Sequence, residues 1–208
     1  RGLTQMIASN FSRSALFTLI AAALLSACVT RSPVVVAPEA IEAAASARGL
    51  TQWQAEGKAG VTFLGNSITA TYNWTRNGKD FDASAAGPLN QGYTTLIGRD
   101  GHLVLDNGWL GRHESDRPDL LTQAITGVPL PIDLLNDWLT GWPHDPLITI
   151  TMLSGEAGAR EFQEHGWNVR VLSEQVQDGY RIPQRLLLTQ DKNRILLIIQ
   201  RWQAKTSA

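Results

Sequence analysis

Apolar and polar side chains alternate along most of the chain after residue 55. The clearest run is Ile68-Thr69-Ala70-Thr71-Tyr72-Asn73-Trp74, in which every second residue is apolar. A period of two predicts strands with one buried face. The dipeptides Asn77-Gly78, Asp100-Gly101 and Asp178-Gly179 are typical of hairpin turns and separate such runs. The pattern therefore predicts an antiparallel meander of roughly ten strands.

The same alternation continues towards the C-terminus. Glu161 and Glu164 are expected to flank a turn. The later strands are expected at residues 147–153, 167–175, 185–189 and 195–202.

Three segments have helical rather than strand-like patterns. Residues 118–125 and 132–140 each have an apolar stripe, and two prolines in Val128-Pro129-Leu130-Pro131 separate them. The Ala-rich residues 39–54 are also predicted to form a helix. We expect the amphipathic helices to close over the concave side of a strongly curved sheet.

The predicted inner face mixes small and large side chains. Ala59, Ala70 and Ala83 share faces with the aromatic residues Phe63 and Tyr72. Such a mixture leaves a hollow in barrels that hold one apolar ligand. A filled core fits the same pattern, so the alternation does not decide between the two.

The N-terminal segment carries the only cysteine. Residues 15–25 are almost wholly apolar, follow Arg13 and end in Leu25-Ser26-Ala27-Cys28. This run has the length of a secretory h-region and is too short to span a bilayer. Its end matches the lipobox of bacterial lipoproteins, which predicts a signal peptide over residues 1–27 and N-acyl and S-diacylglycerol groups on Cys28. The alternative is a small buried hydrophobe, the usual role of a lone cysteine.

The predicted lipid anchor divides the chain into three parts. Residues 28–38 form an extended tether, and residues 39–208 form one domain. Val29 follows the cysteine where Asp commonly signals retention in the inner membrane, which favours the outer membrane.

Composition and motifs offer no sign of an enzyme. Eighteen Lys and Arg against nineteen Asp and Glu give a net charge of −1, and no basic stretch favours nucleic acid. The chain has no G-x-S-x-G motif, and Asp116 and Asp119 are expected at a helix start. We expect no metal and no cofactor beyond the lipid groups of Cys28. The four histidines lack metal-ligand spacing: His102, His113, His144 and His165.

Several short motifs, taken in order, resemble the LolB family of outer-membrane lipoproteins. The match begins at Trp53-x-x-x-Gly57 and ends at Trp202. Its most specific part is Gly127-x-Pro129-Leu130-Pro131, followed by Leu135-x-x-Trp138-Leu139-x-Gly141-x-Pro143. Gly166-Trp167-x-Val169 follows these motifs. Glu164 departs from the Gln that is usual in the family, which weakens the match only slightly.

The resemblance implies a fold and a function. It implies an incomplete antiparallel β-barrel of about ten or eleven strands with a helical lid and an apolar cavity for acyl chains. It implies a monomer that takes acylated lipoproteins from the periplasmic carrier LolA. This acceptor faces the periplasm and delivers its cargo to the inner leaflet of the outer membrane. We expect the cavity lining to include Phe63, Ile68, Tyr72, Trp74, Leu135, Trp138, Leu139, Trp167 and Val169.

One loop is a candidate for delivery. Residues 87–92 place Pro88 and Leu89 between two predicted strands. A loop leucine usually folds back onto the core. In the resembling family a leucine of this loop protrudes and is important for inserting cargo, so Leu89 is expected to contact the bilayer or the cargo.

Three alternatives stay open at this point. The first is a scaffold lipoprotein of an outer-membrane assembly complex, with a filled core and no acyl binding. The second is an envelope enzyme without a recognisable catalytic arrangement. The third is a soluble carrier of the donor type, which acylation of Cys28 would exclude.

Overall fold

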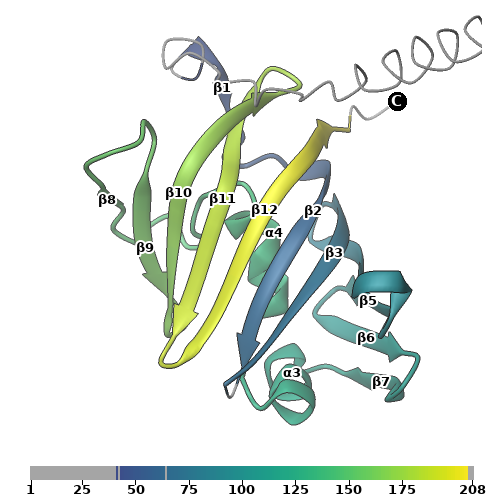
Figure 1. The fold of residues 1–208 in the computed structure, drawn as a ribbon. Helices are drawn as coiled ribbons and strands as arrows, with labels where there is room; N and C mark the ends of the chain where they lie inside the picture. The colour runs from purple at the N-terminus through teal and green to yellow at the C-terminus, as the bar shows by residue number, and fades with distance from the viewer. Residues whose placement is uncertain (1–40, 42, 64, 206–208) are drawn as a thin grey trace, which may run out of the picture. The chain divides into compact units, whose positions relative to one another are not determined.

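Twelve strands join into one strongly curved sheet whose concave side is covered by short helical segments (Figure 1). The structure, a computed structural model, describes residue 41, residues 43–63 and residues 65–205. The predicted signal peptide, Cys28 and the tether lie outside these described residues. Among the described residues, no helix is both long and apolar enough to cross a bilayer.

The strands and helical segments follow one another with short connections. The strands are β1 (Ala45–Ser46), β2 (Gln52–Phe63), β3 (Asn66–Asn77), β4 (Asp80–Ala86), β5 (Thr94–Arg99), β6 (His102–Asn107), β7 (Gly111–Ser115), β8 (Thr151–Met152), β9 (Arg160–Glu164), β10 (Trp167–Gln177), β11 (Tyr180–Gln190) and β12 (Asn193–Ala204). The helical segments are η1 (Pro88–Asn90), α3 (Pro118–Thr126), η2 (Ile132–Leu134) and α4 (Leu135–Trp138).

The sheet is an open meander in which all neighbouring strands on the main path are consecutive in sequence except β2 and β12. Its strands run β7-β6-β5-β4-β3-β2-β12-β11-β10-β9-β8, and β1 pairs in parallel with β11. The pairing of described residues ends at β7 on one side and at β8 on the other, so the sheet does not close. The predicted fold class, an incomplete antiparallel barrel with a helical lid, is confirmed. The described residues form twelve strands rather than ten or eleven.

Tight turns with left-handed backbone fix the hairpins. Gly78 has a φ of 68° between β3 and β4, and Asp178 and Gly179 have φ values of 51° and 77° between β10 and β11. Two-residue turns with positive φ match the right-handed twist of the strands they join. The turn at Gly78 sets the β3–β4 register, which puts Tyr72 opposite Ala85 on β4. On the other side of β3, Tyr72 lies opposite Gly57 on β2.

Three aromatic rings pack together at one end of the core. Trp53 on β2 and Trp202 on β12 are buried and stacked with ring centroids 6.4 Å apart. Tyr180 packs edge-on against Trp202 at 5.5 Å. These rings come from strands at the two ends of the described chain, so their packing holds the first and last long strands together.

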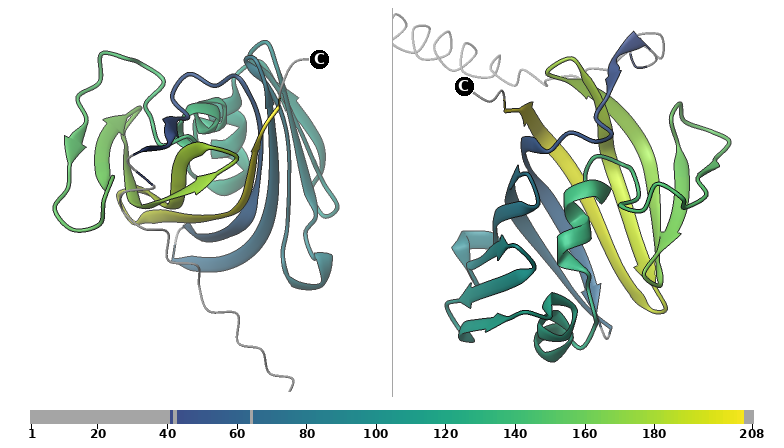
Figure 2. Two further views of the ribbon diagram at one scale, coloured as in Figure 1. Left: turned by 90° about the horizontal axis from the view of Figure 1, so that it is seen from above. Right: turned by 180° about the vertical axis from the view of Figure 1, so that it is seen from behind.

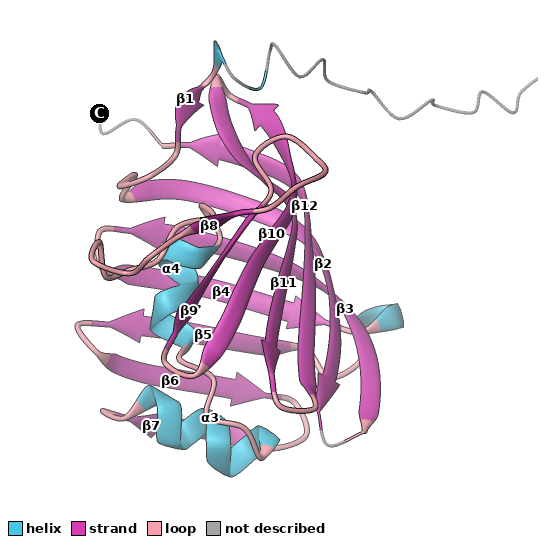
Figure 3. Ribbon diagram, turned by 90° about the vertical axis from the view of Figure 1, so that its left-hand side faces the viewer, coloured by secondary structure: helices cyan, strands magenta, loops and turns pink. Residues whose placement is uncertain are grey.

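Three of the helical segments, α3, η2 and α4, lie on the concave side of the sheet. Figure 2 shows the sheet wrapping around η2 and α4, and Figure 3 shows α3 and α4 on its open side. We call residues 130–141, which contain η2 and α4, the cover. The prediction of a helix over residues 132–140 is confirmed for residues 132–138, in two short pieces. Gly141, with a φ of 84°, follows three residues after the end of α4.

The predicted helix over residues 39–54 is wrong from Ala45 onwards. Ala45–Ser46 is strand β1, Gly49 has a φ of 79°, and β2 begins at Gln52. The Ala-rich composition favours a helix only weakly. Packing overrides it, because Ala47 and Trp53 are both fully buried in the sheet's core.

The region around β8 and β9 also differs from the prediction. Only Thr151–Met152 of the expected strand over residues 147–153 is extended and paired, and Arg160–Glu164 is a strand that the alternation did not reveal. Glu161 therefore lies inside a strand and does not flank a turn, whereas Glu164 ends the strand directly before the turn at His165 and Gly166. The reason is that β9 buries Arg160 and Glu164 beside Phe162, so its inward positions carry charge.

Candidate functional site

An apolar cavity of about 190 Å³ lies between the concave face of the sheet and the cover. Strands β2 to β5, β11 and β12 supply one wall, and the cover supplies the other. All the lining side chains are apolar except Ser84 and the phenol of Tyr72. The lining consists of Ala59, Val61, Phe63, Tyr72, Trp74, Ala83, Ser84, Ala85, Leu96, Leu130, Ile132, Leu135, Leu139, Leu188, Ile195 and Leu197.

The structure brings five of the nine predicted lining residues together around this cavity. Phe63 lies at the end of β2, and Tyr72 and Trp74 follow each other on the inner face of β3. Leu135 and Leu139 approach from the cover. Two sequence signals, the period of two and the helical stripe, therefore locate both walls.

The structure places the other four elsewhere. Ile68 lies on the same strand but beyond the cover, where 64% of it is exposed. Trp138, Trp167 and Val169 are fully buried and are not part of the lining. The indole Nε1 of Trp138 is turned towards Glu164, at 2.6 Å. Periodicity identifies the buried face but not which neighbour each side chain meets.

Tyr72 brings a polar atom to this apolar site. Its Oη is buried without a hydrogen-bond partner in the described part of the chain. Burial raises the pKa of Tyr72 well above its ordinary value, so the phenol stays neutral. The ring lies over Gly57, where a Cβ would come within 3.0 Å of Tyr72 Oη and would collide with the Ile198 carbonyl. Glycine at this position is therefore required by close packing.

Side-chain hydrogen bonds hold the cover against β3 and β4. Asn136 accepts a bond from Trp74 Nε1 at 2.9 Å and donates to the carbonyl of Lys79 at 3.1 Å. Arg76 donates to the Asn136 carbonyl at 3.0 Å and forms a 2.7 Å ion pair with Asp137. Because Asn136 is buried, each of these groups would cost free energy without its partner.

A second set of bonds holds the cover against β9. Glu164 accepts hydrogen bonds from Trp138 Nε1 and from the backbone amides of His144 and Asp145. Arg160 donates to the carbonyl of Gly141, the residue that ends the cover. The cover is thus bound on both sides of the open sheet.

These anchoring residues were missed at the sequence level. Asn136 and Asp137 are polar residues of the predicted amphipathic helix, and such residues usually face solvent. Arg76 and Glu164 occupy inward-facing positions of their strands, two residues from Trp74 and Phe162. This alternation is the signal that could have predicted that they are buried. Their roles depend on neighbours about 26 to 62 residues away, and one sequence does not reveal such pairs.

The loop over residues 87–92 projects away from the sheet. Leu89 is 94% exposed and has a φ of 56°, and Asn90 has a φ of 63°. Gly87 donates its amide to the Gln91 carbonyl at 2.8 Å, which closes the base of the loop beneath Pro88. The predicted tip residue therefore does protrude, in a backbone conformation that costs a leucine free energy.

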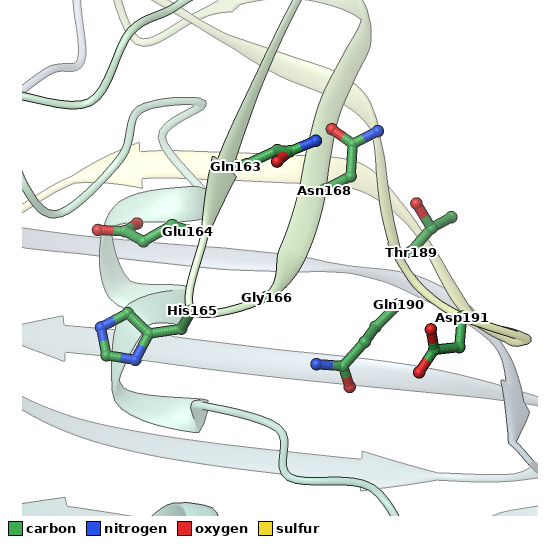
Figure 4. Close-up of a pocket in the computed structure, with 8 residues that line it drawn as sticks. All are labelled: Gln163, Glu164, His165, Gly166, Asn168, Thr189, Gln190 and Asp191. Atoms are coloured by element: carbon green, nitrogen blue, oxygen red, sulfur yellow. The ribbon is translucent and has the colours of Figure 1, made fainter.

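A separate polar hollow of about 340 Å³ lies between the β9–β10 and β11–β12 turns. Figure 4 shows the side chain of Glu164 projecting away from those of Asn168 and Gln190. Its lining is polar, unlike that of the cavity under the cover, so it does not suit an apolar ligand. Among the described residues, no group of three potential ligands is placed to hold a metal ion.

Comparison with known proteins agrees with this architecture. The family model described as "Outer membrane lipoprotein LolB" matches residues 51–202. An outer-membrane lipoprotein LolB of Pseudomonas putida is 32% identical over 156 residues, which cover 75% of this chain and 76% of that protein. One of Pseudomonas fluorescens is 31% identical over 157 residues, covering 76% of this chain and 77% of that protein.

Solved structures give a weaker likeness. A LolA-superfamily protein of Nitrosomonas europaea aligns over 84% of this chain and 96% of its own, with 9% identity and a TM-score of 0.49. The family match covers both walls of the cavity, the whole cover and the loop of Leu89. The chain belongs to the LolB family of outer-membrane lipoproteins.

Proposed function

We propose that this protein is an outer-membrane-anchored acceptor that takes lipoproteins from the periplasmic carrier LolA. It holds their acyl chains in the cavity under the cover and inserts them into the outer membrane. The observation that carries the proposal is the apolar cavity itself, bounded by Tyr72 and Trp74 on one side and by Leu135 and Leu139 on the other.

The energetics suit a carrier that uses no nucleotide. Each buried methylene contributes about 0.8 kcal/mol, so a few methylenes in the cavity hold a chain firmly. A donor and an acceptor that differ by about 1.4 kcal/mol already favour one direction tenfold. The bilayer buries the whole chain and is the final acceptor.

In this proposal, the lipid groups on Cys28 anchor the protein to the outer membrane. Several acyl groups on one cysteine give lasting attachment, whereas a single chain gives only marginal binding. The tether of residues 28–38 then keeps the domain on the periplasmic side of the membrane that receives the cargo. We expect the protein to act as a monomer, with one cavity per anchored chain.

Leu89 is proposed to act at release. Its exposed side chain stands at the tip of a closed loop that has no charged residue between positions 87 and 92. Contact of this tip with the bilayer would bring the cavity close to the acyl region of the membrane.

The test is a two-step transfer. Purified LolA carrying a lipoprotein is mixed with this protein, and the complex is then added to liposomes. We expect the wild type to accept and insert the cargo, and Leu89→Glu to accept it without inserting it. A folded protein that accepts no lipoprotein and binds no fluorescent fatty acid would overturn the proposal.

A further inference from the structure

A groove of about 400 Å³ lies on the inner face of the sheet where the cover no longer reaches it. Ile68 and Ala70 of β3 and Ala85 of β4 form part of its floor, and the Leu89 loop closes its outer end. Ile68 is largely exposed, so this part of the inner face is apolar but uncovered.

The groove continues the cavity. Ala85 lines both, and Tyr72, which lies opposite Ala85 in the β3–β4 pairing, lines the cavity. Ala70 is the next inner-face residue on β3 and lines the groove alone. An apolar chain can therefore pass from one to the other along a single strand face.

Trp109 forms the outer wall of the groove. It is 76% exposed, and its ring lies against Gly92 of the Leu89 loop, within 3.0 Å of where a Cβ would stand. Gly92 has a φ of 59° and leaves room for the ring. Leu110, the next residue, is 54% exposed, so two large apolar side chains adjoin this end of the groove. Exposed apolar patches of this kind mark ligand-binding grooves.

Hydrogen bonds of Asn107 fix the position of the turn that carries Trp109. Its side chain is buried, accepts hydrogen bonds from the amides of Trp109 and Leu110, and donates to Thr94 Oγ1 and to the Gly92 carbonyl. The turn that carries Trp109 is thus fixed to the Leu89 loop and does not hang free.

The volumes indicate what the groove is for. A methylene group takes about as much space as a water molecule, roughly 30 Å³. The cavity of about 190 Å³ then holds only part of a long acyl chain, and the groove of about 400 Å³ accommodates the rest.

We propose that the groove between Ile68 and Trp109 binds the carboxyl-proximal half of one acyl chain of a bound lipoprotein, while the tail of that chain lies in the cavity. This inference rests on the proposed function and adds to it a second subsite and a path. The chain leaves the cavity past Ala85, runs beneath Trp109 and reaches the membrane beside Leu89.

Bromine quenching locates the chain. Bromine quenches tryptophan fluorescence only at near-contact range, and of the seven tryptophans Trp109 lies at the groove and Trp74 at the cavity. The probes are two stearoylated cysteine peptides, one brominated at carbons 6 and 7 and one at carbons 15 and 16. They are titrated into the mature chain carrying Cys28→Ala, which needs no detergent, and into the same chain with Trp109→Phe.

We expect the peptide brominated at carbons 6 and 7 to quench the fluorescence of Trp109→Phe much less than that of the protein that keeps Trp109. The peptide brominated at carbons 15 and 16 should quench both proteins to the same extent. Equal quenching of both proteins by the first peptide, with normal binding, would overturn the groove subsite and leave the proposed function standing. No binding of either peptide to either protein would overturn both.

Blocking the groove provides an independent test. Ala70→Phe fills its floor, and the matched control Thr71→Phe adds the same ring on the exposed face of the same strand. Ala70→Phe should weaken binding of a stearoylated peptide at least about tenfold, the effect of losing two buried methylenes. A six-carbon acyl peptide should bind both variants as it binds the wild type. Wild-type affinity of Ala70→Phe for the stearoylated peptide would contradict the subsite.

Discussion

The indole of Trp138 donates a 2.6 Å hydrogen bond to the carboxylate of Glu164, and both side chains are buried. This bond joins the middle of the cover to the end of β9, on the far side of the sheet from the bonds that Asn136 makes to β3 and β4. The cover therefore spans the open sheet and is fixed at both sides, with the cavity beneath it.

Removing the acceptor at Glu164 should weaken the fold. Glu164→Leu leaves the indole of Trp138 and the amides of His144 and Asp145 without a partner. The buried indole N–H costs about 1–3 kcal/mol when it has no acceptor, and the loss of the two amide bonds adds to this cost, so the free energy of unfolding should fall by at least about 1–3 kcal/mol. Urea unfolding measures this. Glu161→Ala, on the same strand with a more exposed ion pair, is the control and should cost less than about 1 kcal/mol.

The buried pair of Arg160 and Glu174 should be costly to break. Their side chains are 3% and 1% exposed, and Nη1 and Oε1 are 2.6 Å apart. Burial lowers the pKa of Arg160, yet Glu174 holds it charged. Arg160→Met should lower the free energy of unfolding by about 3–5 kcal/mol.

Adding Glu174→Leu to Arg160→Met should recover part of that loss, because no charge then remains buried without its partner. Arg201→Met removes an exposed pair and is the control. Thermal unfolding that is equal for Arg160→Met and Arg201→Met would argue against a structural role of the buried pair.

Substitution of Leu89 should impair the insertion of cargo without lowering the stability of the protein. Its left-handed backbone costs a leucine about 1–2 kcal/mol, and asparagine tolerates that conformation better. Leu89→Asn should therefore leave the protein as stable as the wild type or more stable by up to about 1 kcal/mol. Insertion into liposomes should nevertheless be lost. Leu120→Asn, at another exposed leucine, should insert normally; a loss in both variants would mean that the loop has no special role.

Filling the cavity should weaken acyl binding without unfolding the protein. Ala83→Leu adds three carbons to the lining beneath the cover. Cavity filling commonly stabilises by about 0.5–2 kcal/mol, so thermal stability should hold or rise. Displacement of a fluorescent fatty acid should show at least about tenfold weaker binding, whereas Thr71→Leu on the outer face should match the wild type. Unchanged affinity in Ala83→Leu would place the acyl site elsewhere.

The sequence predicts which residues of each long strand face inwards. It does not predict how far along the strand the cover reaches. The alternation that includes Ile68, Tyr72 and Trp74 puts all three on the inner face, as observed. Only the structure shows that the cover reaches Tyr72 and Trp74 and stops before Ile68. Where the cover lies depends on Asn136 and Glu164, whose partners are distant in sequence.

Strand β9 shows the second limit. Its inward positions include Arg160 and Glu164, and a pattern that expects apolar residues inside does not identify such a strand. Charges at these positions are tolerated because Glu174 and the indole of Trp138 meet them. Those contacts exist only once the sheet has curved and the cover is in place.

The central claim is that acyl chains occupy the cavity beneath the cover, and a crystal structure with a diacylated cysteine peptide tests it most directly. We expect electron density for an acyl chain between Trp74 on β3 and Leu139 on the cover. A structure at saturating peptide with the chain on the outer face of the sheet and the cavity empty would contradict it.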